Sequence, residues 1–256
     1  MGFVCGCSIL TNFCFAVVVM KKILAIGDSY LDQECDSYKG QDIKFWPEYF
    51  DDASVVVIGG SGASNDWILN TTFDAIQEHK PDLVICQWSQ SMRLSFHNNH
   101  VSVGFDKNDN FYSTGRGALK NVGERVYFDS DHFRVDVLIK YMLRRIKMVN
   151  AFHNNVFHVF GPNFFNHIHF KEETDVVKRP GQTRSRLVYE HMLQNMPEAF
   201  APIVQTRDFM FSQENFLKLQ RDYDKLIIGN GDVHPSNEGH YLTYKYFSKY
   251  IRMLYD

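Results

Sequence analysis

The sequence predicts an α/β protein, a three-layer α/β/α sandwich around a parallel sheet of about five strands. Short apolar runs rich in β-branched residues recur along the chain, helical patterns separate them, and small or polar residues follow each run. Continuous apolar runs are typical of strands buried on both faces, as in parallel sheets. Strands that alternate with helices pack into layers through right-handed crossovers.

The elements follow from these runs. Strands are expected at 23–26, 55–58, 83–86 and 156–160, and a fifth near 203–206 or 226–228, between which the pattern does not decide. Helices are expected at 65–79, at 131–152, from about Asn237 onward, and in a short turn that Trp46-Pro47 opens. Ser64 suits the N-cap of the helix at 65–79, and Lys80-Pro81 suits its end.

Length and composition indicate one domain. The chain has 256 residues, of which 45% are hydrophobic, and its formal net charge is -3. We expect a single domain over 20–256, with polar, aperiodic insertions at 94–130 and 163–200. A chain without a basic excess gives no indication of a nucleic-acid partner.

The N-terminal extension, 1–19, has two interpretations. Residues 3–20 are almost wholly apolar, but no basic segment precedes them as in a signal peptide, and the run is short for a membrane span. If translation starts at Met20, we expect a cytoplasmic protein. Otherwise the run makes the protein secreted or membrane-anchored, and membrane association would depend on 3–20 alone.

The sequence predicts no metal and no cofactor. Its five cysteines show no CxxC spacing and are interpreted as reduced, non-catalytic thiols. Four histidines lie near the fourth strand, and we interpret them as a polar, aromatic surface rather than a chelating site; they are His153, His158, His167 and His169.

Residues that can carry chemistry follow the first three strands and precede the last helix. They are Gly27-Asp28-Ser29-Tyr30, the Gly-rich turn at 59–65, the polar stretch at 87–91 with Arg93, and Asp232-Val233-His234-Pro235. Carboxyl ends of parallel strands meet at one edge of a sheet, where ligands bind, so we expect these stretches to lie together.

Their residue types suit acyl transfer. A serine hydroxyl becomes a good nucleophile when a histidine takes its proton and a carboxylate orients that histidine. The Gly-rich turn can offer backbone N–H groups to an anion. Taken singly, Gly-Asp-Ser is also an ordinary turn, and Asp-x-His-Pro is also a helix start. Arg93 could pair with a substrate anion, but Asp28 or a surface carboxylate is the expected partner.

In the order and position of these motifs, the chain resembles the SGNH (GDSL-like) hydrolases from residue 23 to 254. The resemblance implies a flavodoxin-like sheet, Ser29 as nucleophile, His234 as base, Asp232 as acid, and Gly62 as an oxyanion donor beside the Ser29 N–H. Two departures stand out. The family's asparagine after strand three is missing, so Ser89 or Gln90 must substitute or the third donor is absent. The family's acid lies three residues before the histidine, where this chain has Gly231.

The resemblance implies a serine esterase that forms an acyl-enzyme with a small-molecule or glycan ester, for instance an acetyl ester of a carbohydrate. Two alternatives stay open: an acyltransferase that uses the same site, and a catalytically silent glycan-binding or structural module. The sequence does not indicate an oligomeric state.

Overall fold

The computed structural model describes the central sheet, the helices on both of its faces and the segment that carries His234. The described residues are 21–89, 91, 93–96, 99–101, 103–105, 111–113, 127–128, 134–160, 223–229 and 232–253. For 94–128, and for several residues of the C-terminal segment including Asp232, the description is of the backbone alone. The extension at 1–19 and the expected insertion at 163–200 lie outside the described residues.

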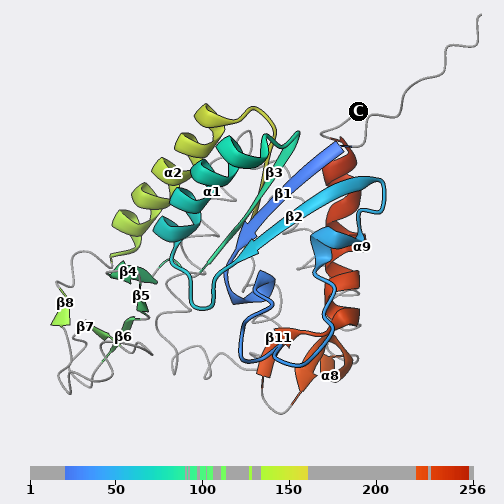
Figure 1. The fold of residues 1–256 in the computed structure, drawn as a ribbon. Coiled ribbons are helices and arrows are strands. Elements are labelled where there is room, and N and C mark those ends of the chain that lie inside the picture. Colours follow the sequence, from blue (N-terminus) through green and yellow to red (C-terminus); the bar gives the residue numbers. More distant parts are fainter. Residues whose placement is uncertain are drawn as a thin grey trace, which may run out of the picture.

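A parallel sheet of four strands forms the centre of the molecule (Figure 1). Its strands, in spatial order, are β2 (Ala53–Gly59), β1 (Lys21–Gly27), β3 (Leu83–Trp88) and β9 (Val156–Phe160). The order matches the start of the flavodoxin-like arrangement, in which the chain reverses its direction of winding after β1 and β2. The predicted α/β class is therefore confirmed.

Strands β1 and β3 form around two of the expected apolar runs, 23–26 and 83–86. Their central residues are fully buried, with Ile23 and Leu83 paired across the two strands. The expected strand at 226–228 falls instead at the end of α8 (Tyr223–Leu226) and in β10 (Ile227–Gly229). Strand β10 pairs antiparallel with β11 (Asp232–Pro235), apart from the parallel sheet. The other candidate, 203–206, lies outside the described residues.

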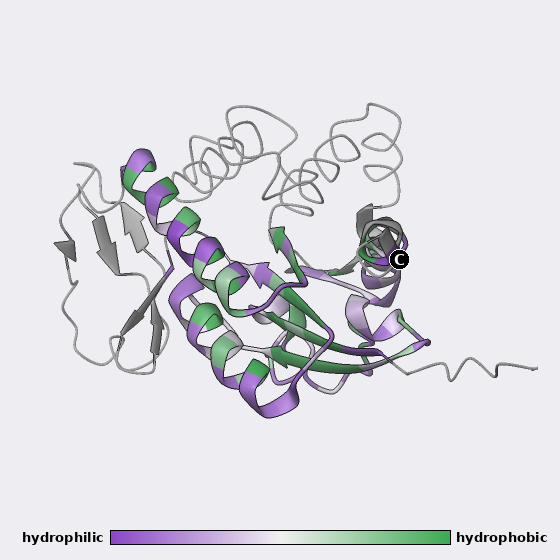
Figure 2. Ribbon diagram, turned by 90° about the horizontal axis from the view of Figure 1, so that it is seen from above, coloured by the Kyte–Doolittle hydropathy of each residue, from purple (hydrophilic) through white to green (hydrophobic). Residues whose placement is uncertain are grey.

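Helices α1 (Asn65–His79) and α2 (Val135–Phe152) cover one face of the sheet. The Ser64 hydroxyl caps α1 by accepting a hydrogen bond from the Trp67 N–H at 3.2 Å, as the sequence predicts. Helix α2 begins four residues later than expected, since Arg134 has an extended backbone. Figure 2 shows apolar residues concentrated on the strands, while the helices also carry polar residues.

The opposite face is covered by α9 (Asn237–Met253) and the short 3-10 helix η2 (Trp46–Tyr49). Pro47 lies in the first turn of η2, where its missing N–H costs nothing. Trp46 and Phe247 are fully buried between η2, α9 and the sheet. This layer fixes the start of α9, directly after the segment that carries His234.

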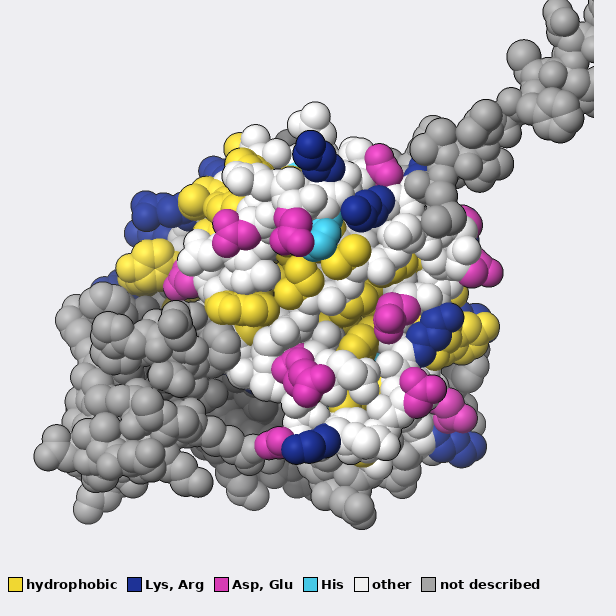
Figure 3. All heavy atoms as spheres, viewed as in Figure 1, with side chains coloured by type: hydrophobic (Ala, Val, Ile, Leu, Met, Phe, Trp, Pro, Cys, Tyr) yellow, Lys and Arg dark blue, Asp and Glu magenta, His cyan; other side chains and the backbone are white. Residues whose placement is uncertain are grey.

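The stretch after β3 contains short antiparallel strands. They are β4 (Leu94–Phe96), β5 (Asn99–Val101), β6 (Val103–Phe105), β7 (Phe111–Ser113) and β8 (Tyr127–Phe128). They form two small sheets separate from the parallel one. On the face in Figure 3, the described basic and acidic side chains are interspersed. Among the described residues, no helix has the length and apolar character that a membrane span requires.

Candidate active site

The carboxyl end of β1 turns sharply into a single turn of 3-10 helix, η1 (Ser29–Leu31). Asp28 caps this turn by accepting a hydrogen bond from the Tyr30 N–H at 3.3 Å. Gly27 allows the close approach, because a Cβ there would lie 2.9 Å from the Leu31 side chain. Ser29 is thereby held at the edge of the sheet and is 6% exposed.

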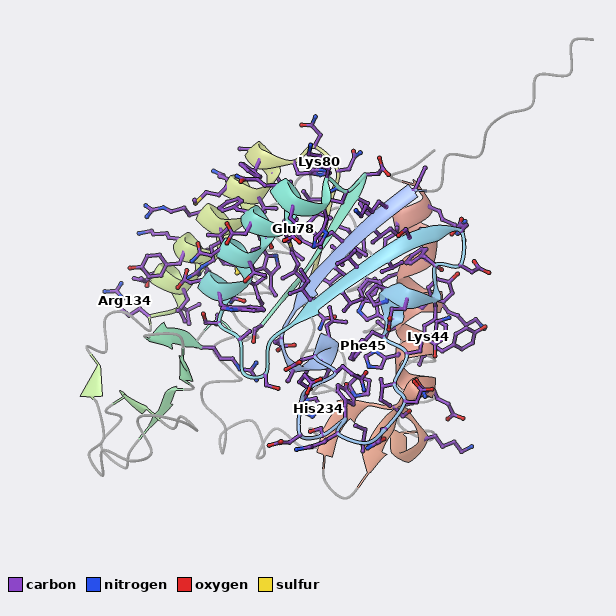
Figure 4. The ribbon with its side chains drawn as sticks, in the orientation of Figure 1. Lys44, Phe45, Glu78, Lys80, Arg134 and His234 are labelled. Carbon is purple, nitrogen blue, oxygen red and sulfur yellow. The ribbon has the colours of Figure 1, made fainter. Side chains whose placement is uncertain are left out.

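Strand β11 brings His234 to this point from the other end of the chain (Figure 4). The Ser29 Oγ lies 2.9 Å from the His234 Nε2, although 205 positions separate the two residues in sequence. Tyr30 stacks on the imidazole at a centroid distance of 4.9 Å, and Tyr38 meets it edge-on at 5.5 Å. The ring is therefore held by packing as well as by its hydrogen bonds.

Two residues that the sequence did not single out also contact His234. The Ser37 Oγ lies 3.1 Å from Nδ1, and the Cys35 Sγ lies 3.8 Å from Nε2. Burial raises the pKa of the Cys35 thiol, but hydrogen bonding with the His234 and Ser61 side chains and with the Ser37 backbone outweighs it and lowers the pKa to about 7. Both residues come from an aperiodic turn, so no sequence pattern could have indicated them.

Asp28, beside the serine, is fully buried and belongs to a polar cluster. Its Oδ2 accepts hydrogen bonds from the Arg93 Nη1 and from the Ser89 hydroxyl, each at 3.0 Å. The expected pairing of Arg93 with Asp28 is confirmed. A carboxylate buried this deeply is tolerated because a cation and a hydroxyl compensate it.

Ser89, one of the two residues that we considered as a substitute oxyanion donor, belongs to this polar cluster. Its hydroxyl donates to Asp28 and accepts from Arg93 at 2.7 Å. Its backbone N–H donates to the Asn65 side chain at 2.8 Å, and its carbonyl accepts from the same amide at 3.2 Å. Ser89 therefore holds Asp28, the residue directly before η1, in place, and its hydroxyl does not point to a substrate. Gln90 and the Asp232 side chain lie outside the described residues.

The Gly-rich turn after β2 packs directly against η1. The Gly60 N–H donates to the Gly27 carbonyl at 3.2 Å, and the Ser61 N–H donates to Asp32 at 2.7 Å. Gly62 has a positive φ of 73°, which favours glycine and turns the backbone into the start of α1. The turn therefore brings the Gly62 backbone to the same edge of the sheet as Ser29.

The histidines near the fourth expected strand are not part of this site where the structure describes them. His158, which we interpreted as part of a polar surface, is instead buried in β9, where it accepts a hydrogen bond from the Trp88 indole N–H at 3.0 Å and lies 2.8 Å from Asn150. Burial lowers its pKa to about 3, so the ring is neutral. His167 and His169 lie outside the described residues, and within these no cluster of three metal-ligating side chains occurs.

Comparison with solved structures finds that the fold is similar to that of an acetylxylan esterase. A catalytic mutant of Axe2, an acetylxylan esterase from Geobacillus stearothermophilus, matches with a TM-score of 0.51 and 15% sequence identity, covering 90% of this chain and 94% of that one. The fold is similar to that of an esterase. A second structure of Axe2 matches over the same shares with 16% identity and a TM-score of 0.47. The sequence matches no protein-family model and no curated protein.

Proposed function

We propose that this protein is a serine esterase with Ser29 as nucleophile and His234 as general base. The observation that carries the proposal is the 2.9 Å contact between Ser29 Oγ and His234 Nε2 at the carboxyl end of the central strand. A hydroxyl at this distance from an imidazole nitrogen can lose its proton as it attacks a carbonyl carbon. A silent structural module would have no need of this contact.

The proposed reaction has two halves. Ser29 Oγ attacks the ester carbonyl carbon while its proton passes to His234 Nε2, and the imidazolium then protonates the departing alkoxide to leave an acyl-enzyme. In the second half, His234 takes a proton from water as the water oxygen attacks the acyl carbon, and the imidazolium then returns the proton to Ser29 Oγ as the bond between Oγ and the acyl carbon breaks and the acid is released. Tyr30 and Tyr38 keep the ring aligned through both proton transfers.

The oxyanion of each tetrahedral intermediate needs donors. The Ser29 N–H stands at the start of η1, and the Gly62 N–H belongs to the turn packed against η1, so these are the proposed donors. Since Ser89 is engaged with Asp28, Gln90 is the remaining proposal for a third. Loss of one such donor typically lowers turnover about 100- to 1000-fold. Asp232, in the strand that carries His234, is the proposed acid.

The proposed substrate is an acyl ester of a carbohydrate, with acetyl as the first acyl group to test. Its support is the fold similarity to an acetylxylan esterase together with the Ser29–His234 pair. An acyltransferase would pass the same acyl group from Ser29 to a sugar hydroxyl. Product analysis with and without a sugar acceptor separates transfer from hydrolysis.

Labelling with a fluorophosphonate tests the proposal. The wild-type protein should be labelled on Ser29, and Ser29→Ala should abolish both labelling and hydrolysis of p-nitrophenyl acetate while circular dichroism stays unchanged. Ser248→Ala, which removes a hydroxyl near the end of α9, is the matched control and should behave like wild type. A folded wild-type protein that neither reacts with the probe nor hydrolyses the ester would rule out the proposed function.

A further inference from the structure

The imidazole of His234 has a second polar contact on the side away from Ser29. Ser37 Oγ lies 3.1 Å from Nδ1, and the two residues are 197 positions apart. For His234 to accept a proton from Ser29 at Nε2, the neutral ring must carry its proton on Nδ1. The group that accepts a hydrogen bond from Nδ1–H therefore favours the reactive tautomer.

Ser37 is held firmly enough to do this. Tyr38, the next residue, is fully buried and lies with its hydroxyl 3.3 Å from the His240 Nε2. The Ser37 carbonyl accepts a hydrogen bond from the Gln41 side chain at 3.1 Å, and Gly40, with a φ of 78°, closes the turn. The hydroxyl is thus presented to the ring by a turn that the buried Tyr38 side chain anchors.

Cys35 does not compete for this role, because its sulfur faces Nε2, the nitrogen that also faces Ser29. The contacts therefore divide by ring nitrogen: Ser29 and Cys35 lie on the reacting side, and Ser37 lies on the far side. A hydroxyl oxygen can accept from Nδ1–H in both the neutral imidazole and the imidazolium, so the contact can persist throughout proton transfer.

We propose that Ser37 is a positioning residue that holds His234 in the tautomer with its proton on Nδ1. This inference rests on the proposed function, because the tautomer matters for catalysis only if His234 is the base. A hydroxyl supplies a dipole where a carboxylate would supply a full charge, so it orients the ring with less stabilisation of the imidazolium. Ser37 would act in this way whether or not Asp232 also contributes.

Removal of the hydroxyl provides the first test. Ser37→Ala should lower kcat about 10- to 100-fold, as expected for loss of one hydrogen bond to a group that becomes charged, with KM nearly unchanged. Ser37→Thr retains the hydroxyl and should restore most of the activity. The acid limb of the kcat/KM profile should move to lower pH in Ser37→Ala, since the lost hydroxyl favours the protonated ring.

A second readout does not depend on activity. The ¹⁵N chemical shifts of the His234 ring at alkaline pH should show Nδ1 protonated in the wild type, and more of the Nε2-protonated tautomer in Ser37→Ala. Wild-type kcat together with an unchanged tautomer in a folded Ser37→Ala variant would overturn the inference. If fluorophosphonate fails to label the wild type, the proposed function fails, and the tautomer measurement still decides whether Ser37 orients the ring.

Discussion

Two side chains that can act as nucleophiles share one imidazole nitrogen. Ser29 Oγ and Cys35 Sγ lie 2.9 Å and 3.8 Å from the His234 Nε2. Sequence composition led us to interpret Cys35 as an inert thiol, because nothing local distinguishes it from the other cysteines. The contact that distinguishes Cys35, with His234, forms only when β11 packs against the turn after η1. The thiol is free and buried, with a pKa lowered to about 7.

This pKa predicts the pH at which Cys35 becomes reactive. The thiolate is the form that alkylates, and its fraction rises as the pH passes the pKa. Labelling of Cys35 by iodoacetamide should therefore reach half of its maximal rate near pH 7, two units below an ordinary thiol with a pKa of 9.0. Peptide mapping by mass spectrometry measures the rate at each cysteine.

Cys86 supplies the internal comparison for this measurement. Complete burial raises the pKa of its thiol to about 12, so it should stay unlabelled in the folded protein. A Cys35 labelling profile centred near pH 9 would mean that the contacts with His234 and Ser61 do not hold the thiolate.

At the scale of elements, the contact between the end of β2 and η1 sets the position of the nucleophile. A methyl group on Gly59 would overlap the backbone of Leu31 and Asp32. Backbone cannot move aside as a flexible side chain can, so η1 would have to shift. The position of η1, and with it that of Ser29, thus depends on the absence of a side chain at Gly59 in β2.

Gly59→Ala should therefore impair activity more than folding. We expect a loss of about 1–3 kcal/mol in the free energy of unfolding from overpacking, and a fall in kcat of about 100-fold from displacement of Ser29. Urea unfolding and steady-state kinetics measure the two effects.

At Gly60 an added Cβ would lie 2.9 Å from the half-buried ring of Trp67, and a side-chain ring can move aside. Gly60→Ala is thus the comparison, and an equal loss of kcat in both variants would contradict the argument.

The regular elements could be predicted because their signals are local. A fully buried parallel strand is a continuous apolar run, and Ser64 and Lys80 mark both ends of α1. Strand β3 nevertheless extends two residues beyond the expected 83–86. Gln87 and Trp88 are buried in the strand, but their polar groups end the apolar run from which the strand was predicted. The expected start of α2 was too early, because Arg134, just before the helix, has an extended backbone that its residue type does not reveal.

The site could be predicted only in part. The proximity of Ser29 and His234 was predicted correctly, but the reason we gave for it was wrong for the histidine: Ser29 follows a strand of the parallel sheet, whereas His234 lies in β11, which pairs with β10 in a separate antiparallel sheet. Side-chain direction does not follow from the topology: Ser89 stands at the expected strand end, but its hydroxyl turns to Asp28. Ser37 reaches His234 from a turn without periodicity, and contacts of that kind depend on tertiary closure.

At the scale of the whole molecule, two buried histidines link stability to pH. Burial lowers the pKa of His158 to about 3, and burial together with the charge of His234 lowers that of His240 to about 3. In the unfolded chain both would titrate near the ordinary histidine pKa of 6.5. Below pH 6.5 the two histidines bind protons in the unfolded state but stay neutral in the folded state. The free energy of unfolding therefore falls as the pH drops from 6.5 toward 3.

The free energy of unfolding should therefore decrease by about 1.4 kcal/mol per pH unit for each of these histidines. His158→Gln removes one titrating group and should reduce the slope between pH 6 and pH 4 by about that amount relative to wild type. Denaturant titrations followed by circular dichroism measure the slope, and the offset at pH 7.5 reports the loss of packing alone. Parallel slopes in the two proteins would show that His158 is protonated in the folded state.

The 205 positions between Ser29 and His234 also determine when the site can exist during folding. Strands β1, β2 and β3 pair within the first third of the chain, so their contacts close short loops. The Ser29–His234 contact closes a much longer loop than these strand pairings do and therefore bears a larger entropic cost of loop closure. During synthesis, the strands that carry Ser29 are therefore translated well before the segment that carries His234. Any activity that depends on the pair therefore reports that the chain has been synthesised and folded at least as far as His234.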